Sequence, residues 1–213
     1  AAFLGHLEML RLWQRALRRA QLPLNLSHGF NPHPRLAFGP ALAVGMESLA
    51  EYLDVELTAP LDPDVFRERL QAQLPAGLEL LLVQPIADGA PALTAIINAA
   101  SYQAAWQEPP EPATLQQKVD GILSLPALMV KRQGKGGVKV KDIRAGIFRL
   151  AARPDGSLEM LLECSSQGSV RPEEVLGAMD LDGPWRLTRT GLFIRRGDAL
   201  LAPETGLSST PIS

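Results

Sequence analysis

The sequence predicts an α+β fold made of two small units in tandem. Apolar residues recur at helical spacing over residues 6–20, they alternate with acidic residues over 51–58, and a similar order of elements can be read again after residue 94. With 213 residues, of which 46% are hydrophobic, the chain can bury a core in each unit. The order within each unit, strand-helix-strand-strand-helix-strand, is that of the ferredoxin-like, or split βαβ, arrangement.

The first predicted unit covers residues 1–88. Its expected elements are a strand ending at Phe3 and Leu4, a helix at 6–20, a short strand from Gln21 to Leu26, an apolar stretch from Leu36 to Val44, a strand at 51–58, a helix after Asp62, and a strand from Leu78 to Val83. Asp62 and Pro63 mark the start of the second helix, because aspartate caps free backbone amides and proline suits the first turn.

The second predicted unit covers residues 94–198. Its expected elements are a strand from Tyr102 to Trp106, a helix capped by Thr114, strands from Ala127 to Val130 and from Val138 to Lys141, two strands around the turn at Pro154-Asp155-Gly156, a helix from Pro172 to Met179, and a strand from Trp185 to Ile194. The additional strand is interpreted as an inserted basic β-hairpin at 131–144. Residues 87–93 are the expected linker, and residues 203–213 are expected to form a disordered tail.

Charge is distributed unevenly along the chain. Residues 127–153 contain eight Lys or Arg and one acid, Asp142, so this stretch carries +7 while the whole chain carries −2. Such asymmetry indicates either a polyanionic partner for one surface or a solvated charged hairpin. The predicted nucleic-acid-binding residues are Lys131, Arg132, Lys135, Lys139, Lys141 and Arg144.

Several chemistries are excluded by the residues present. The lone cysteine, Cys164, rules out an internal disulfide and a cysteine-ligated zinc or iron–sulfur centre within this chain, and alternation predicts that it is a small core residue. No Walker phosphate loop, dinucleotide-binding glycine pattern or nucleophile elbow occurs. No apolar run is long enough to cross a bilayer, and we expect a cytoplasmic protein without a bound metal.

The segment Ser27-His28-Gly29-Phe30-Asn31-Pro32-His33-Pro34-Arg35 is the strongest candidate site. Its two prolines push the preceding Asn31 and His33 toward extended backbone, which restricts those side chains. His28 and His33 could act as acid and base, serve as metal ligands or bind an anion, and a stiff structural turn is the alternative interpretation. We expect the polar groups of this loop to meet at an open, positively charged cleft.

Arginines of the first predicted helix extend this candidate site. Arg11, Arg15 and Arg18 fall on one stripe of the helix, which is either a solvated face or, if it lies beside the loop, a phosphate-binding surface. The predicted substrate-binding residues are His6, Arg11, Arg15, Ser27, His28, Asn31, His33 and Arg35. No catalytic residue is assigned; His28 and His33 are the candidates.

The chain resembles a bacterial domain of unknown function that is linked to radical SAM proteins. The matching segments include Phe3 to Arg11, Arg15 to Leu24, the loop from Ser27 to Arg35, Glu47-Ser48 with Glu51 to Val55, and Lys141 to Arg144. The resemblance implies a domain that is fused to, or encoded beside, a cobalamin-binding radical SAM protein. Members carry a few more residues before Phe3, so we expect this chain to be a fragment.

The resemblance implies an accessory role. An iron–sulfur cluster, S-adenosylmethionine and cobalamin would reside only on the partner or on a missing N-terminal half, because this chain lacks the three-cysteine motif. The leading hypothesis is a non-catalytic, substrate-binding domain that works with such a partner in RNA modification. The alternatives are a metal-independent, histidine-dependent RNA endonuclease, an analogy at the level of fold, and a protein-docking module without its own ligand.

Overall fold

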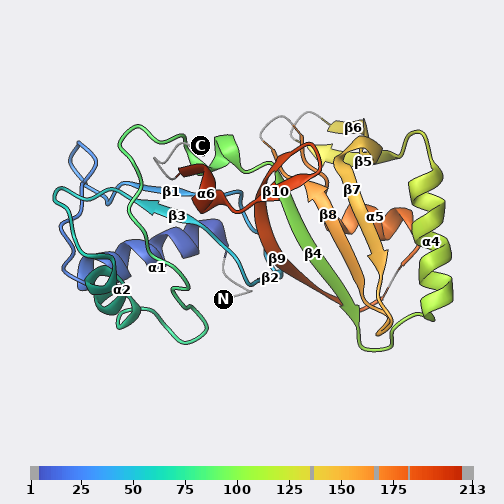
Figure 1. The fold of residues 1–213 in the computed structure, drawn as a ribbon, viewed down its shortest axis with the longest axis horizontal. Coiled ribbons are helices and arrows are strands. Elements are labelled where there is room, and N and C mark those ends of the chain that lie inside the picture. The colour runs from blue at the N-terminus through green and yellow to red at the C-terminus, as the bar shows by residue number, and fades with distance from the viewer. Residues whose placement is uncertain (1–4, 135–136, 166–167, 182, 208–213) are drawn as a thin grey trace.

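The computed structural model describes residues 5–134, 137–165, 168–181 and 183–207, without the side chains of His6 and Leu207. The fold is a mixture of helices and antiparallel sheets, so the α+β prediction is confirmed. Figure 1 shows two parts side by side, a smaller N-terminal part and a larger part built on a twisted sheet. The predicted strand ending at Phe3 and Leu4 lies outside the described residues.

The N-terminal part contains two helices and a small sheet. Its elements are α1 (His6–Arg19), β1 (Leu36–Phe38), β2 (Glu47–Ser48), β3 (Leu53–Val55) and α2 (Pro63–Gln71). Strands β1 and β3 pair antiparallel, with Leu36 opposite Val55. Helix α2 begins as predicted: Asp62 accepts hydrogen bonds from the amides of Asp64 and Val65, at 2.9 and 3.2 Å.

The larger part contains the main sheet. Its elements are α3 (Leu93–Ile96), β4 (Ala99–Trp106), α4 (Pro112–Ser124), β5 (Met129–Gly134), β6 (Gly137–Asp142), a 3₁₀ turn (Arg144–Gly146), β7 (Ile147–Ala152), β8 (Leu158–Glu163), α5 (Pro172–Ala178), β9 (Trp185–Arg196), β10 (Ala199–Leu201) and α6 (Pro203–Leu207). The main sheet has the order β10-β9-β4-β8-β7, with every neighbouring pair antiparallel. Strands β5 and β6 form a separate two-stranded sheet.

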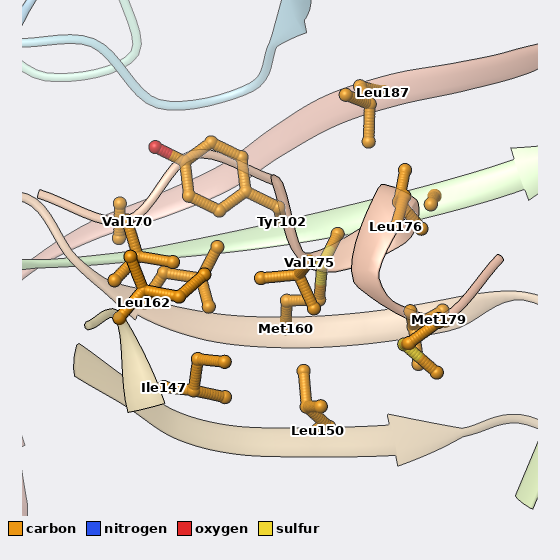
Figure 2. Close-up of a cluster of buried hydrophobic side chains, with 14 of the residues drawn as sticks. Tyr102, Ile147, Leu150, Met160, Leu162, Val170, Val175, Leu176, Met179 and Leu187 are labelled. Carbon is orange, nitrogen blue, oxygen red and sulfur yellow. The ribbon is translucent and has the colours of Figure 1, made fainter. Parts of the chain in front are cut away.

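Each part has its own hydrophobic core. In the larger part, α4 and α5 pack on one face of the main sheet, and Leu115 of α4 is buried in this core. Figure 2 shows Val175 and Leu176 of α5 on the same side of the sheet as Met160 of β8. In the smaller part, α1 and α2 pack together through Leu17 and a group of neighbouring apolar side chains. Burial of each such side chain contributes about 1.5–3 kcal/mol, which explains why alternation and helical spacing predict most of these elements.

The two parts are joined through β2. Strand β2 pairs in parallel with β9, with Glu47 opposite Thr188 and Ser48 opposite Arg189. Met46, immediately before β2, is only 5% exposed and lies in the core of the larger part. Residues of the predicted first unit therefore complete the sheet and core of the second.

The predicted strand from Leu78 to Val83 is wrong. This segment follows α2 without strand pairing, and Leu81 and Leu82 are 65% and 59% exposed. Its backbone bonds instead to the side chain of Gln71, which donates to the carbonyl of Leu78 at 3.0 Å and accepts from the amide of Leu80 at 2.7 Å. Hydrogen bonds to the side-chain amide of Gln71 thus take the place of the strand partner that the apolar run predicts.

Two other predictions need correction. Instead of a strand from Gln21 to Leu26, the structure has two isolated bridges, from Leu24 to Leu57 and from Leu26 to Pro34. Prolines next to both bridges lack the amide hydrogen that a longer ladder would use. The expected disordered tail begins with a short helix, α6, while residues 208–213 lie outside the described residues.

Candidate functional site

The loop from Ser27 to Arg35 is the tip of a tight hairpin. The amide of Ser27 donates to the carbonyl of His33 at 2.8 Å, and the amide of His33 donates to Oγ of Ser27 at 3.0 Å. Leu26 bridges Pro34, whose ring is buried. These bonds and the two prolines fix the base of the loop, as the sequence predicts.

The tip of this hairpin projects into solvent. His28, Asn31 and His33 are exposed, and the ring of Phe30 is fully exposed. Neither of the two cavities described below is lined by a residue of this loop. The loop is therefore a projecting surface, rather than the cleft expected from the sequence.

The arginine face of α1 lies beside the loop. Arg18 donates from Nη2 to the carbonyl of Pro32 at 2.5 Å. Arg11 and Arg15, on the same stripe, are exposed and make no ion pair with the described residues. Helix α1 presents this face because Ala16 and Leu17 bury its opposite side. The stripe and the loop therefore lie side by side on the surface.

Arg35 has a different environment. Its Nη1 lies 3.3 Å from Oε2 of Glu56, and the amide nitrogen of Asn25 donates to the same oxygen at 3.0 Å. Its charge is thus partly neutralised within the protein, although both partners of this pair are exposed. The side chain of His6 is not among those described.

Three of the six residues predicted to bind nucleic acid at the basic hairpin β5–β6 make contacts within the protein. Arg132 forms a bidentate pair with Glu174 at 2.5 and 2.6 Å, and Lys141 donates to the carbonyl of Ser169 at 3.2 Å. Arg144 donates to the carbonyls of Leu123 and Ile147 at 2.8 and 3.3 Å. These contacts attach the hairpin to the larger part of the molecule.

The remaining predicted residues of the hairpin are solvent-exposed where described. Lys131 and Lys139 are exposed, and they lie on opposite faces because Lys131 pairs with Val140 whereas Lys139 pairs with Arg132. Lys135 lies outside the described residues. The hairpin therefore offers a weaker basic surface than its composition indicates.

The Arg132–Glu174 pair shifts the titration of both groups. Although burial raises the pKa of the Glu174 carboxyl, hydrogen bonds from Arg132 and from the amide of Arg171 hold it below its ordinary value. The same hydrogen bond with Glu174 raises the pKa of Arg132. Both groups remain charged at neutral pH, so the pair fixes the hairpin.

Sequence reasoning missed the most buried charged residue, Arg189 of β9. Its guanidinium forms a bidentate pair with Glu51 at 2.7 and 2.8 Å and donates to the carbonyls of Ala41 and Pro40 at 3.2 and 3.0 Å. Arg189 is 1% exposed. The sequence pattern that could have revealed it is a single arginine at an inward-facing position of β9, where the other inward-facing residues are apolar.

Cys164 is the inert core residue that the sequence predicts. It packs partly buried against the main core, and burial raises the pKa of its thiol to about 12. Since the thiolate is the reactive form, this cysteine is a poor nucleophile at neutral pH. No group of three metal-ligating side chains gathers anywhere in the described part of the chain.

Two hollows lie outside the loop. One, of about 580 Å³, is a shallow hollow at the C-terminal end of α2, between Arg67 and Glu79. The other, of about 240 Å³, lies on the face of the main sheet that α4 and α5 leave open, between Gln103, Arg149 and Phe193. The second was not anticipated, because the polar residues that line it alternate with core residues along the strands.

Comparison with known proteins gives a family without an assigned activity. The model of a family described as "Uncharacterized protein conserved in bacteria (DUF2344)" matches residues 1–172, a range that includes the loop, the arginine face of α1 and the basic hairpin. A search of curated proteins finds no match. Among the described residues, no helix is long and apolar enough to span a membrane.

Proposed function

We propose that this chain, which belongs to that bacterial family (DUF2344), is a non-catalytic accessory domain that binds RNA for a cobalamin-type radical SAM protein in the cytoplasm. The resemblance of its loop and flanking segments suggests the partner. The exposed basic surface suggests the RNA. Iron–sulfur, S-adenosylmethionine and cobalamin chemistry would then belong to the partner, which receives a substrate held by this chain.

The proposal rests mainly on one observation: the arginine face of α1 lies beside the loop. Arg11 and Arg15 are exposed and form no ion pair with the described residues, a condition suited to phosphate binding. Arg18 ties this face to Pro32, so the tip with Phe30 lies next to it. A cationic face beside an exposed aromatic ring supports binding of both the phosphates and the bases of RNA.

The fold supports the same kind of role. We propose that residues 94–198 form a ferredoxin-like unit, because β9-β4-β8-β7 is an antiparallel order with α4 and α5 in the two crossovers. The N-terminal part has the corresponding helices but, in its described residues, a sheet of only two strands, β1 and β3. The tandem relation of the two units therefore remains a proposal.

A filter-binding titration of tRNA and rRNA fragments across salt concentrations tests the proposal. We expect affinity to fall steeply with salt and the double variant Arg11→Gln/Arg15→Gln to weaken binding about tenfold and to reduce the salt slope by about 2. Arg67→Gln is the matched control, because Arg67 is an exposed arginine of α2.

Three results would contradict the proposal. Affinity that ignores both salt and the double variant removes the RNA-binding role. Metal-independent cleavage of labelled RNA that disappears in His28→Ala and His33→Ala replaces it with a nuclease. A pull-down that retains the radical SAM protein while no RNA binds replaces it with a docking module.

A further inference from the structure

The main sheet has one covered face and one open face. Along β4, Ala100, Tyr102 and Ala104 point into the core beneath α4 and α5, so Ser101 and Gln103 lie on the opposite face. That face carries the hollow of about 240 Å³, which is small for a drug-sized ligand but has room for one planar ring system. In Figure 1 this face belongs to strands β9, β4, β8 and β7.

An aromatic ring on this face packs closely against a glycine. A Cβ atom on Gly191 would come within 2.5 Å of the ring of Phe193 and 3.0 Å of Oγ of Ser101. The glycine therefore lets the Phe193 ring rest directly on the strand, and the ring remains partly exposed at the wall of the hollow. A ring held in this way is a platform on which a second flat group can stack.

The charge around the hollow favours an anion. Arg149 lines the hollow, is exposed and forms no ion pair with the described residues. The acid at the hollow, Glu159, is paired with Arg153. At the end of the same sheet, the Arg195 guanidinium lies 4.1 Å from the centre of the Phe148 ring and 3.9 Å from Asp198.

Polar groups line the floor. The hydroxyls of Ser101 and Thr190 are 2.8 Å apart, and Gln103 donates its amide to Oγ of Ser157 at 3.2 Å, which leaves its carbonyl oxygen without a partner in the described chain. Nucleobase edges carry both donors and acceptors, so such groups can pair with them. A floor of Ser, Thr and Gln fits a base better than it fits an apolar segment of a protein.

We propose that this open face binds single-stranded RNA, with one unpaired base in the hollow against Phe193 and a neighbouring phosphate at Arg149. The proposal rests on the proposed function and specifies the form of the substrate. A duplex hides the flat surfaces of its bases, whereas a loop or a single strand can splay one out onto an aromatic ring. The α1 surface would then bind the flanking backbone.

The test uses the full chain and two probes, a short oligouridylate with a fluorescent label and free AMP. We expect Phe193→Leu to weaken oligouridylate binding about 5- to 100-fold and Phe193→Tyr, which keeps the ring, to restore it. Arg149→Gln is expected to weaken binding severalfold, with Arg67→Gln as the matched control. Thermal unfolding of each variant establishes that it is folded.

AMP separates this inference from the function on which it rests. In amide NMR spectra we expect AMP to shift the signals of Ser101, Thr190 and Phe193. These shifts support the inference even if the tRNA and rRNA fragments that test the proposed function do not bind. If oligouridylate binding depends on Arg11 and Arg15 but is unchanged in Phe193→Leu, the inference is overturned and the proposed function remains. Shifts at these amides with the radical SAM protein, but with neither nucleotide probe, also overturn it and identify a protein-docking face.

Discussion

Arg189 occupies a position where the alternation of β9 calls for an aliphatic residue. It is tolerated because a carboxylate and two carbonyls of one neighbouring segment, Pro40 to Glu51, accept its hydrogen bonds. Two carbonyls and one carboxylate replace the water that the guanidinium loses. The arginine therefore orients the segment that leads into β2, so that one side chain fixes the junction of the two parts.

Removing the carboxylate at this junction is predicted to be costly. Glu51→Gln leaves the buried guanidinium of Arg189 without its counter-charge and should lower the free energy of unfolding by about 2 kcal/mol or more. Glu56→Gln is the matched control: it breaks the exposed pair with Arg35 and should cost about 0–1 kcal/mol. Chemical denaturation measures both, and equal losses would contradict this account.

The Arg132–Glu174 pair predicts a pH dependence. The pKa of Glu174 is lower in the folded protein than its ordinary 4.5, so the pair stabilises the fold above that pH and loses its effect as pH falls through the lower folded value. Glu174→Gln should therefore be less stable than wild type at about pH 7, and the difference should shrink as the pH falls below 4.5.

Unfolding midpoints across this pH range check the prediction. Glu173→Gln serves as the control, because Glu173 is the exposed neighbour of Glu174 in α5. A difference between wild type and Glu174→Gln that stays constant with pH would show that the pair does not act through its charge.

At the residue scale, the sequence locates the candidate loop but not its form. The prolines of the Ser27–Arg35 segment predict a rigid corner, and the hydrogen bonds between Ser27 and His33 agree with this. The sequence could not predict that Glu56 pairs with Arg35 or that Glu174 pairs with Arg132. Those pairings join residues 21 and 42 positions apart and depend on the tertiary structure.

At the scale of elements, prediction succeeds where burial is periodic. Helices α1 and α2 and strands β7 and β8 follow helical spacing or alternation with clear caps and turns. The segment from Leu78 to Val83 shows the limit of this reasoning, because only its Leu80 and Val83 pack against the small core while Gln71 bonds to its backbone. Strand β2 is too short to show a period, and its partner lies in the other half of the sequence.

Replacing glycine by alanine is predicted to change stability in opposite directions at Gly156 and Gly121. Gly156 turns the chain between β7 and β8 with φ +77°, and a Cβ there would lie 2.5 Å from Cβ of Pro109. Gly156→Ala should therefore lower stability by about 1–3 kcal/mol. Gly121, inside α4, has no atom within 4 Å of an added Cβ, so Gly121→Ala should raise stability by about 0.5–1 kcal/mol.

Thermal or chemical unfolding of the two alanine variants measures this contrast. Both variants add the same methyl group, so any difference in stability between them reflects the position of the glycine. Changes of the same sign in both variants would contradict the assigned backbone conformations.

At the scale of the whole molecule, the two parts depend on each other. Met46 lies in the core of the larger part, β2 extends its sheet, and the hydroxyl of Tyr52 donates to Glu204 of α6 at 2.9 Å. Burial and the nearby Glu204 carboxylate raise the pKa of Tyr52, so this bond persists well above neutral pH. The sequence composition changes near residues 87–93, as expected for a linker, but these contacts join the parts on either side of it.

Cleavage between the parts is predicted to leave them associated. Residues 81–91 are largely exposed and have no strand pairing, which makes them the expected site of limited proteolysis. The nicked protein should elute from a size-exclusion column at the position of the intact chain, although denaturing electrophoresis shows two fragments. Separate elution of the fragments in native buffer would show that the contacts across the boundary are too weak to hold them.

The pairing of β2 with β9 also bears on self-association. The free amides and carbonyls of an edge strand can pair with a strand of another chain. Without β2 and β10, β9 would be such an edge strand. Its outward side is instead occupied by β2 near Thr188 and by β10 near Arg195. At the opposite border, β7 carries an irregularity between Ile147 and Arg149 that interrupts regular pairing. The sheet therefore resists edge-to-edge pairing with other chains, which allows its open face to stay exposed without promoting fibril formation.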